Sequence, residues 1–469
     1  MKKRIINFIL ASFFTGTCFN AFAQQKDSSH THAFSAKEAV NYALNNAVQV
    51  KNALLDIKLQ EQTNKGITAA ALPHLSASGS LSYNPNVAVQ TFPNFIAAST
   101  YGVLVKENIK DGNGNPITVP SDFGVIQAGF GSKYSLNGGI DLNQLLFDGQ
   151  VFVGLQARKA SIKNMELTAD VTKEQIKANV YKIYYQLIVG QRQIGTLDAN
   201  IANYEKLLHD TREIYKNGFA EKLDVDKVQV QLSNLQTQKL KAQNQIDAGI
   251  EGLKFLMNMP QKDELVLTDT LSDEEIKSNI LDENFNYEDR KEVQQLEALM
   301  ELGNYNVKRY KLSKLPTLSL AGNFSQSAQR QEFDFFKGPY FTSSFLALRI
   351  NVPIFDGGER NSNIAAAKLN LLKMHNNMDQ LKASIENDVT QSRLNMKSAI
   401  FTMDTQKKNI ALAEQVYNST KLKYEQGLGS NQEISTAQAD LVTAQNNYYS
   451  SLYDAIIAKI DFLKAAGKL

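Results

Sequence analysis

The chain reads Leu-Pro-His-Leu-Ser-Ala-Ser-Gly-Ser-Leu-Ser at residues 72–82, and it reads Leu-Pro-Thr-Leu-Ser-Leu-Ala-Gly-Asn-Phe-Ser at residues 315–325. Two shorter motifs return in the same order, about 208 residues later: Phe147-Asp148-Gly149 as Phe355-Asp356-Gly357, and Tyr215-Lys-Asn-Gly218 as Tyr424-Glu-Gln-Gly427. The unit that repeats is roughly 200 residues long, well above the ~20–50 residues of solenoid repeats. The sequence therefore predicts an internal duplication, in which each copy reads strand, loop, strand, long helix, sharp turn, long helix.

Four Ser-rich segments alternate between apolar and polar residues, at about 75–84, 134–143, 317–324 and 346–354. Strict alternation predicts strands with one apolar and one polar face. We expect these strands to pair within about 73–147 and about 315–355. Two interpretations stay open at this point: a soluble antiparallel sheet on a core, or strands of an outer-membrane barrel. The small, uncharged polar faces favour the membrane, where four strands could close a barrel only if several chains shared it.

The segments inside each strand pair read as surface loops. Residues 91–129 carry three prolines and the turn-rich stretch Asp-Gly-Asn-Gly-Asn at 111–115, which predicts a long loop. Residues 328–341 form a shorter, aromatic and charged counterpart. We expect both to cap the strands or to serve in recognition.

A heptad pattern begins after Gly149. One position of the heptad holds apolar or aromatic residues at every step: Val180, Leu187, Ile194, Ile201, Leu208 and Tyr215. The pattern predicts a coiled-coil seam and two long helical hairpins, at about 150–257 and about 360–466. Shorter helices are expected before each strand pair, at 36–65 and 288–311. A soluble coiled-coil scaffold would explain these helices, but it would not explain the alternating strands.

The termini and the linker complete the predicted organisation. Residues 1–23 read as a signal peptide, with a charged start, an apolar middle and Ala21-Phe22-Ala23 as cleavage site. The single cysteine, Cys18, lies in the segment to be removed; a lipobox is the alternative, but the usual leucine three residues before it is missing.

The acidic stretch at 260–284, with a strand candidate at 265–267, is expected to form a belt around the middle of the helices. We therefore predict a first repeat at 24–284 and a second at 285–469.

Composition and motifs exclude several function classes. The net charge of +2 gives no electrostatic basis for binding nucleic acid. Phosphate loops, nucleophile elbows and zinc-protease motifs are missing from the sequence, and the five histidines are scattered. His30 and His32 could bind a metal weakly, but a polar N-terminal segment explains them as well. We expect no catalytic, cofactor or metal site.

The duplicated motifs, taken together and in order, resemble the TolC-like outer-membrane efflux proteins over about residues 34–466. The resemblance implies an α+β membrane protein that is a homotrimer, with four strands per chain in a shared twelve-stranded antiparallel β-barrel. The helices would continue as a coiled-coil tunnel through the periplasm. Such a protein is a passive exit duct without a catalytic site. Its implied partners are outer-membrane lipid, a periplasmic adaptor and an inner-membrane pump of the RND or ABC type.

The resemblance also implies roles for particular residues. The adaptor-contacting tips would carry Tyr215, Gly218, Leu223, Asp224, Tyr424, Gly427 and Glu433, with Asp224 helping to hold a closed tip together. The strand-to-helix junctions would be Phe147 to Gly149 and Phe355 to Gly357.

The entrance departs from the family pattern. Well-known members narrow it with a ring of aspartates, whereas here the stretch contains Lys407, Ile410 and a single acid, Glu414. We expect an entrance that is less cation-selective. The exported substrate, whether a drug, a metal ion or a protein, is left open. The competing function is a non-channel scaffold or adhesin that spans the periplasm.

Overall fold

The computed structural model describes residues 30–129, 131–270, 276–277 and 285–469. They belong to two compact units. The helical unit comprises the described residues within 1–51, 172–286 and 387–469, and the sheet unit comprises those within 52–171 and 287–386. Each unit takes residues from both predicted repeats. The predicted signal peptide and its cleavage site lie outside the described residues, as do residues 271–275 and 278–284 of the predicted belt.

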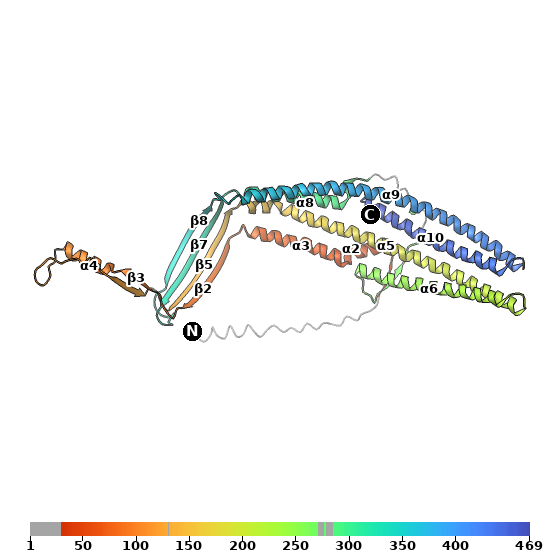
Figure 1. Cartoon of the computed structure of the whole chain (residues 1–469), viewed down its shortest axis with the longest axis horizontal. Helices are drawn as coiled ribbons and strands as arrows, with labels where there is room; N and C mark the ends of the chain where they lie inside the picture. The colour runs from red at the N-terminus through yellow and green to blue at the C-terminus, as the bar shows by residue number, and fades with distance from the viewer. Residues whose placement is uncertain (1–29, 130, 271–275, 278–284) are drawn as a thin grey trace. The chain divides into compact units, whose positions relative to one another are not determined.

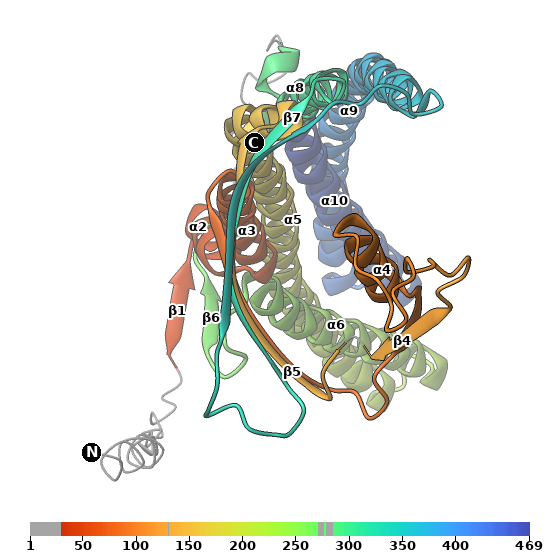
Figure 2. The same cartoon turned by 90° about the vertical axis from the view of Figure 1, so that its left-hand side faces the viewer.

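The sheet unit contains a four-stranded antiparallel sheet in the order β2-β5-β7-β8 (Figures 1 and 2). Its strands are β2 (His74–Tyr83), β5 (Tyr134–Phe147), β7 (Thr317–Arg330) and β8 (Phe341–Asn351). The four predicted strands are thus confirmed. The last one ends earlier than its alternating pattern, which runs to Ile354. Pro353 has no N–H to donate to the ladder and so ends the strand.

The register brings the predicted apolar positions onto one face. Across the four strands, Leu75 pairs with Leu142, Leu142 pairs with Gly322, and Gly322 pairs with Leu346. Leu75 and Leu346 are nevertheless 72% and 71% exposed. Within the described residues, this chain therefore supplies no core against the apolar face, and the interpretation as a soluble sheet packed on its own core is wrong.

The predicted loop at 91–129 contains secondary structure of its own. Strands β3 (Val89–Pro93) and β4 (Val125–Gly129) pair antiparallel, and helix α4 (Phe95–Lys106) follows β3 directly. Asn94 caps this helix, because its side chain accepts the Ala97 N–H at 2.9 Å. The turn-rich stretch is a tight turn as predicted, in which the Asp111 carboxylate accepts two backbone N–H groups.

Each strand pair passes into its long helix through an aspartate. After β5, Asp148 accepts the Gln150 N–H at 2.7 Å and so caps α5 (Gly149–Lys216). Gly149 is required there, since a Cβ would lie 2.7 Å from the Leu312 carbonyl oxygen.

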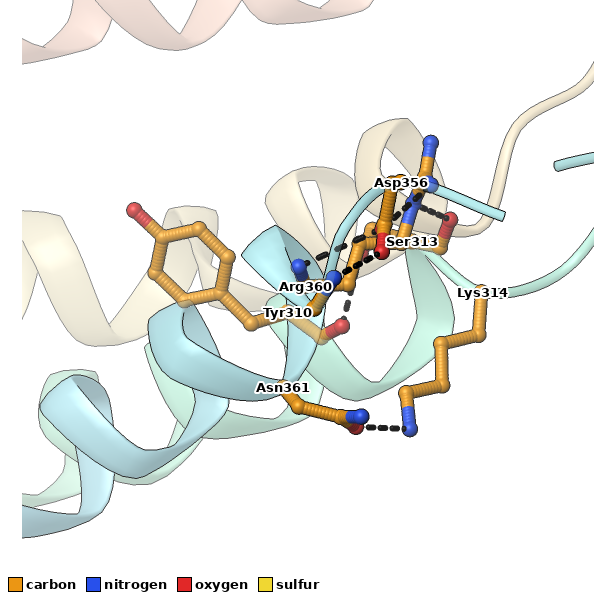
Figure 3. Close-up of polar contacts among 7 residues, drawn as sticks. Tyr310, Ser313, Lys314, Asp356, Arg360 and Asn361 are labelled. Atoms are coloured by element: carbon orange, nitrogen blue, oxygen red, sulfur yellow. Dashed lines mark hydrogen bonds and ion pairs between the residues drawn. The ribbon is translucent and has the colours of Figure 1, made fainter. Parts of the chain in front are cut away.

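The second junction, before α9 (Glu359–Glu425), is tied by charge (Figure 3). Asp356 accepts the Gly358 N–H and an Arg360 guanidinium N–H, the latter at 2.6 Å. Burial would raise the pKa of Asp356, but these hydrogen bonds together lower it. Phe147 and Phe355, the aromatic residues of the two junctions, are both exposed. The two copies of Phe-Asp-Gly therefore serve as helix starts.

The helical unit contains the ends of two hairpins, α5 with α6 (Lys222–Met257) and α9 with α10 (Asn431–Ala465). The predicted seam is buried at Val180, Leu187 and Leu208, whereas Tyr215 at its end is exposed. On α6 and α10, Val228, Leu253 and Leu452 are completely buried. The heptad pattern is thus confirmed, except at the last turn.

The helix predicted at 36–65 is two helices, α2 (Ala36–Asn46) and α3 (Val48–Ala69). Ala47 between them is extended, with ψ 134°. The Asn46 carbonyl accepts the Asn258 side-chain N–H at 3.2 Å. This long-range hydrogen bond explains why the local pattern does not predict the break. The counterpart in the second repeat is α8 (Lys291–Leu312), preceded by the short η2 (Tyr287–Asp289).

A parallel strand pair fixes the start of the described chain. The predicted strand at 265–267 is confirmed as β6 (Glu264–Leu267), and it pairs with β1 (Thr31–Phe34). His32 of the polar N-terminal segment lies in β1, and His30 directly precedes it. The Asp263 carboxylate accepts the His30 backbone N–H and lies 3.2 Å from His32 Nε2. The hydrogen bond from the His30 N–H, helped by His32, lowers the pKa of Asp263 below its usual range.

We expect Asp263→Asn to loosen β1. Because the pKa of Asp263 is lowered in the folded chain, its contribution is complete above the ordinary carboxyl value and is lost as pH falls through the lowered pKa. Hydrogen exchange of residues 30–34, corrected for intrinsic rates, should speed up in the variant at neutral pH, and in the wild type only under strong acid. Asp247→Asn, at an exposed carboxyl on α6, is the control. Equal protection in both variants at neutral pH would contradict the assignment.

Candidate functional site

The two hairpin tips close with the same turn. Gly218 and Gly427 have φ of 78° and 72°, the left-handed region that favours glycine. At the first tip, the Gly218 N–H bonds the Tyr215 carbonyl at 2.9 Å and the next N–H bonds the Ile214 carbonyl at 3.0 Å. The second tip repeats both bonds, from Gly427 to Tyr424 and from Leu428 to Lys423. The duplicated Tyr-x-x-Gly motif is therefore a helix-ending Schellman turn.

The acids that follow the turns cap the returning helices. Asp224 accepts the Glu221 N–H at 3.3 Å, and Glu433 accepts the Ser430 N–H at 3.4 Å. Ser430 in turn accepts the Glu433 N–H. Both carboxylates thus occupy the third position of a capping box. This local role explains why an acid follows each glycine by six residues.

Large apolar side chains are exposed at the turns. Phe219 and Leu428, directly after the two glycines, are 85% and 78% exposed, and Leu223 and Tyr215 are also exposed. Tyr424 instead turns inward, where its hydroxyl lies 3.3 Å from that of the buried Thr211. Phe219 and Leu428 lie within the predicted tip segments 215–224 and 424–433, although they were not among the residues named individually. Their position one residue after each turn glycine was the available signal.

The contacts between the two tips are polar and long. Asn431 donates to the Asp224 carbonyl at 3.3 Å, and Lys227 donates to Gln432 at 3.4 Å. The ion pair between Lys206 and Glu425 is exposed and measures 3.9 Å. Exposed pairs of this kind contribute only ~0–1 kcal/mol each. Apolar packing between the hairpins begins close behind these contacts, where Val228 and Ile434 are buried in the same cluster as Leu441.

Unsatisfied polar groups lie buried close to the tips. Gln438 is completely buried on α10, and neither its amide nitrogen nor its amide oxygen has a hydrogen-bond partner in the protein. The Ser435 hydroxyl, one turn nearer the tip, is in the same situation. Each such group costs about 1–3 kcal/mol. Parting of the hairpins here would expose these groups to water and recover part of that cost.

Two buried tyrosines mark the apolar side of the same region. Burial, with a smaller effect from Tyr417, raises the pKa of Tyr204 to about 12. Burial likewise raises the pKa of Tyr417. Both phenols therefore stay neutral over the physiological pH range, and this part of the packing does not titrate.

The three residues predicted at the entrance lie on α9. Lys407 and Glu414 are exposed and share a face, since seven residues make about two turns. Ile410 is half-buried and continues the buried row of Met396, Met403 and Tyr417. The described chain therefore places the two charges outward and Ile410 towards the packing of the hairpins.

The described residues offer nothing for catalysis by a metal or for a helical membrane span. In the ranges that the structure covers, no three His, Cys, Asp or Glu side chains gather as they would around a metal ion. Among the same residues, no helix is both long enough and apolar enough to cross a bilayer.

We expect Gly218→Val to loosen the first tip. A Cβ at Gly218 would meet no atom within 4 Å, so the cost comes from the backbone alone, about 1–2 kcal/mol. Proteolysis and hydrogen exchange of residues 212–224 should speed up by about tenfold. Gly218→Asn is the matched control, because asparagine tolerates the left-handed region. If valine and asparagine behaved alike, backbone strain would not be the cause.

Comparison with known proteins agrees with this architecture. The chain matches the family model described as "Outer membrane efflux protein" over residues 39–259 and 287–468. It is 19% identical to the outer membrane protein TolC of Vibrio cholerae over 348 residues, covering 71% of this chain and 77% of that protein. It is 21% identical to the alkaline protease secretion protein AprF of Pseudomonas aeruginosa, covering 70% and 68%.

Solved structures share the fold. The CmeC outer membrane channel of Campylobacter jejuni aligns with a TM-score of 0.69 and 17% identity, covering 92% of this chain and 85% of that chain. The predicted family and the outer-membrane location are confirmed. The chain belongs to the outer membrane efflux protein family.

Proposed function

We propose that this chain is the passive outer-membrane exit duct of a tripartite efflux or type I secretion system. Three copies form a twelve-stranded antiparallel barrel with four strands each, and their long helices continue as a tunnel in the periplasm. A periplasmic adaptor and an inner-membrane pump of the RND or ABC type supply substrate and energy. The duct itself performs no chemical step.

The observation that carries this proposal is the open four-stranded sheet. Within the part of the chain that the structure describes, its outer strands, β2 and β8, each pair on one side only. In lipid, an open edge leaves backbone N–H and C=O groups without partners, at several kcal/mol each. Known single-chain bacterial barrels begin at ~8 strands, so four strands cannot close alone. Pairing of β2 with β8 of the next copy removes every edge and turns the exposed leucines of the apolar face towards lipid.

A second stripe on α9 supports assembly of several copies. Leu394, Phe401 and Leu422 share one heptad position and are 57%, 73% and 56% exposed, with Lys408 and Gln415 at that position between them. The apolar residues lie on the face opposite the buried Met396 and Met403, because two residues turn a helix by about 200°. Exposed apolar side chains on one helix face favour burial against a partner. Helices of a neighbouring copy provide this partner in the proposed tunnel.

The tips are the proposed docking surface for the adaptor. Phe219 and Leu428 present exposed apolar side chains at the turns, next to Leu223. The closing role proposed for Asp224 would act through its carbonyl, which accepts the Asn431 N–H, since the carboxylate caps its own helix. Both efflux and secretion remain in the proposed function. The matching family is named for efflux, and the relative AprF is named for protease secretion.

The test is single-channel conductance in planar bilayers, with native mass spectrometry of the purified full-length protein. We expect a trimer that inserts and conducts. Phe401→Glu should lower the trimer fraction, because it places a charge in the proposed helix interface, whereas Asn395→Glu, on an exposed flank of the same helix, should leave it unchanged. A monomer or dimer without conductance would reject the duct and favour the periplasmic scaffold or adhesin.

The entrance gives a separate prediction. With Lys407 beside the single acid Glu414, we expect weak cation preference and no block by trivalent cations. The double variant Lys407→Glu, Lys408→Glu should raise the cation preference and create sensitivity to trivalent cations, because carboxylates then dominate the stretch. Reversal potentials in a salt gradient measure both. Strong cation preference in the wild type would overturn this expectation.

A further inference from the structure

Basic residues collect where the strands meet the helices. The sixteen residues next to the helix-facing end of each strand (58–73, 148–163, 301–316 and 352–367) contain ten Lys or Arg and five Asp or Glu. The segments at the opposite strand ends, 84–133 and 331–340, contain four basic and five acidic residues. The chain as a whole is close to neutral, at +2. The excess of positive charge is therefore specific to one end of the sheet.

Helix dipoles explain only part of this excess. Lys308, Arg309 and Lys311 lie in the last turns of α8, where cations are favoured. Arg158, Lys159 and Lys163 instead lie nine to fourteen residues after the start of α5, beyond the first turn in which the dipole acts. The helix dipole therefore does not account for these three cations.

Two of the cations line one hollow. It has a volume of about 190 Å³ and lies between α3, α5 and α8 within the sheet unit. Ile67, Val153, Ala157 and Leu302 give it an apolar floor, and Arg158 and Arg309 supply its charge. The residues that line this hollow include no acid. An apolar floor under two guanidinium groups matches an anion that also carries hydrocarbon.

Arg158 is positioned by a network of hydrogen bonds. It donates to the Thr68 hydroxyl at 2.7 Å and to the Leu155 carbonyl at 3.0 Å. Asn64, which is buried, donates to the Arg158 carbonyl at 3.0 Å and accepts from Gln60 and Ser161. Every one of these partners is neutral, and the guanidinium keeps further N–H groups for a ligand.

The nearby cations also meet neutral groups. Arg309 stacks over the Tyr310 ring at 4.8 Å. Lys308 donates to Gln156, and Lys314 donates to Asn361 at 2.6 Å (Figure 3). Among the described residues, neither Arg158 nor Arg309 has a carboxylate within ion-pair distance. The positive charge of the hollow is therefore not neutralised by this chain.

We propose that the hollow binds the phosphate headgroup of an anionic phospholipid from the membrane leaflet at this end of the strands. Nine residues separate Arg158 from Gly149, about 13 Å of helix at ~1.5 Å per residue. The headgroup layer of a bilayer, about 5–8 Å on each side, and the length of an arginine side chain together span that distance. The two guanidinium groups bind the phosphate, and the acyl chains run over the apolar floor towards the strands.

The proposal goes beyond the duct but rests on the proposed membrane crossing of the four strands, which conductance tests separately. Its test is native mass spectrometry of the purified full-length protein, titrated with phosphatidylglycerol, with diacylglycerol or with inorganic phosphate. We expect phosphatidylglycerol to stay bound and diacylglycerol to be lost. The double variant Arg158→Gln, Arg309→Gln should bind phosphatidylglycerol about tenfold more weakly, as the loss of charge-assisted hydrogen bonds predicts.

The matched control is Lys163→Gln, which removes an exposed cation of α5 outside the hollow. It should leave lipid binding unchanged, and Arg158→Lys should give an intermediate loss because lysine lacks the planar fork. Thermal unfolding of each variant checks that it is folded, and conductance reports on the duct separately. Equal binding by the double variant and the control would overturn the site. Displacement of the lipid by equimolar inorganic phosphate would overturn the lipid assignment and indicate a site for free anions.

Discussion

The rest of the structure depends on the hydrogen-bonding requirement of a sheet that has two open edges. Backbone N–H and C=O groups on the outer sides of β2 and β8 need partners, and in lipid water cannot provide them. Within the described residues the chain supplies four strands to this sheet, so in the proposed trimer the neighbouring copies complete the ladder. The same register that aligns Leu75 with Leu346 gives the sheet one continuous apolar face, which the proposed barrel turns towards lipid. In the proposed duct, assembly of the copies is therefore part of folding.

Duplication makes the two hairpins alike at the level of local chemistry. Both tips use a left-handed glycine and a capping box, and each of these devices lies within ten consecutive residues. A turn or cap that is formed by so few consecutive residues can be recognised directly from the amino-acid sequence. The contacts between the tips leave no such local motif. Thr211, Asn431 and Gln432 each contact a residue more than 200 positions away in the sequence. The sequence motif thus describes how each tip closes, and the structure adds how the two tips hold each other.

Prediction from the sequence succeeded where periodicity or a local turn decides the structure, as in the four strands, the seam and the tips. It failed where distant residues decide. Strand β1 exists because β6, more than 200 residues away, pairs with it, and the break at Ala47 depends on Asn258. Helix α4 was missed for another reason: prolines and glycines around it concealed an apolar stretch that Asn94 caps. Phe219 and Leu428 lie within the predicted tip segments, and only their position after each turn glycine, not their residue type, indicates that they are exposed.

The balance of forces along the hairpins indicates where they separate first. Further from the tips, the two hairpins share a cluster in which Met403 and Leu452 are completely buried, which makes separation expensive. At the tips, hydrogen bonds of 3.3–3.4 Å and an exposed ion pair contribute little. Between these regions, Gln438 and Ser435 pay a desolvation cost that water would relieve. Free energy of opening therefore rises from the tips inward, and a partner that binds the exposed Phe219 and Leu428 acts at the end where the least work is needed.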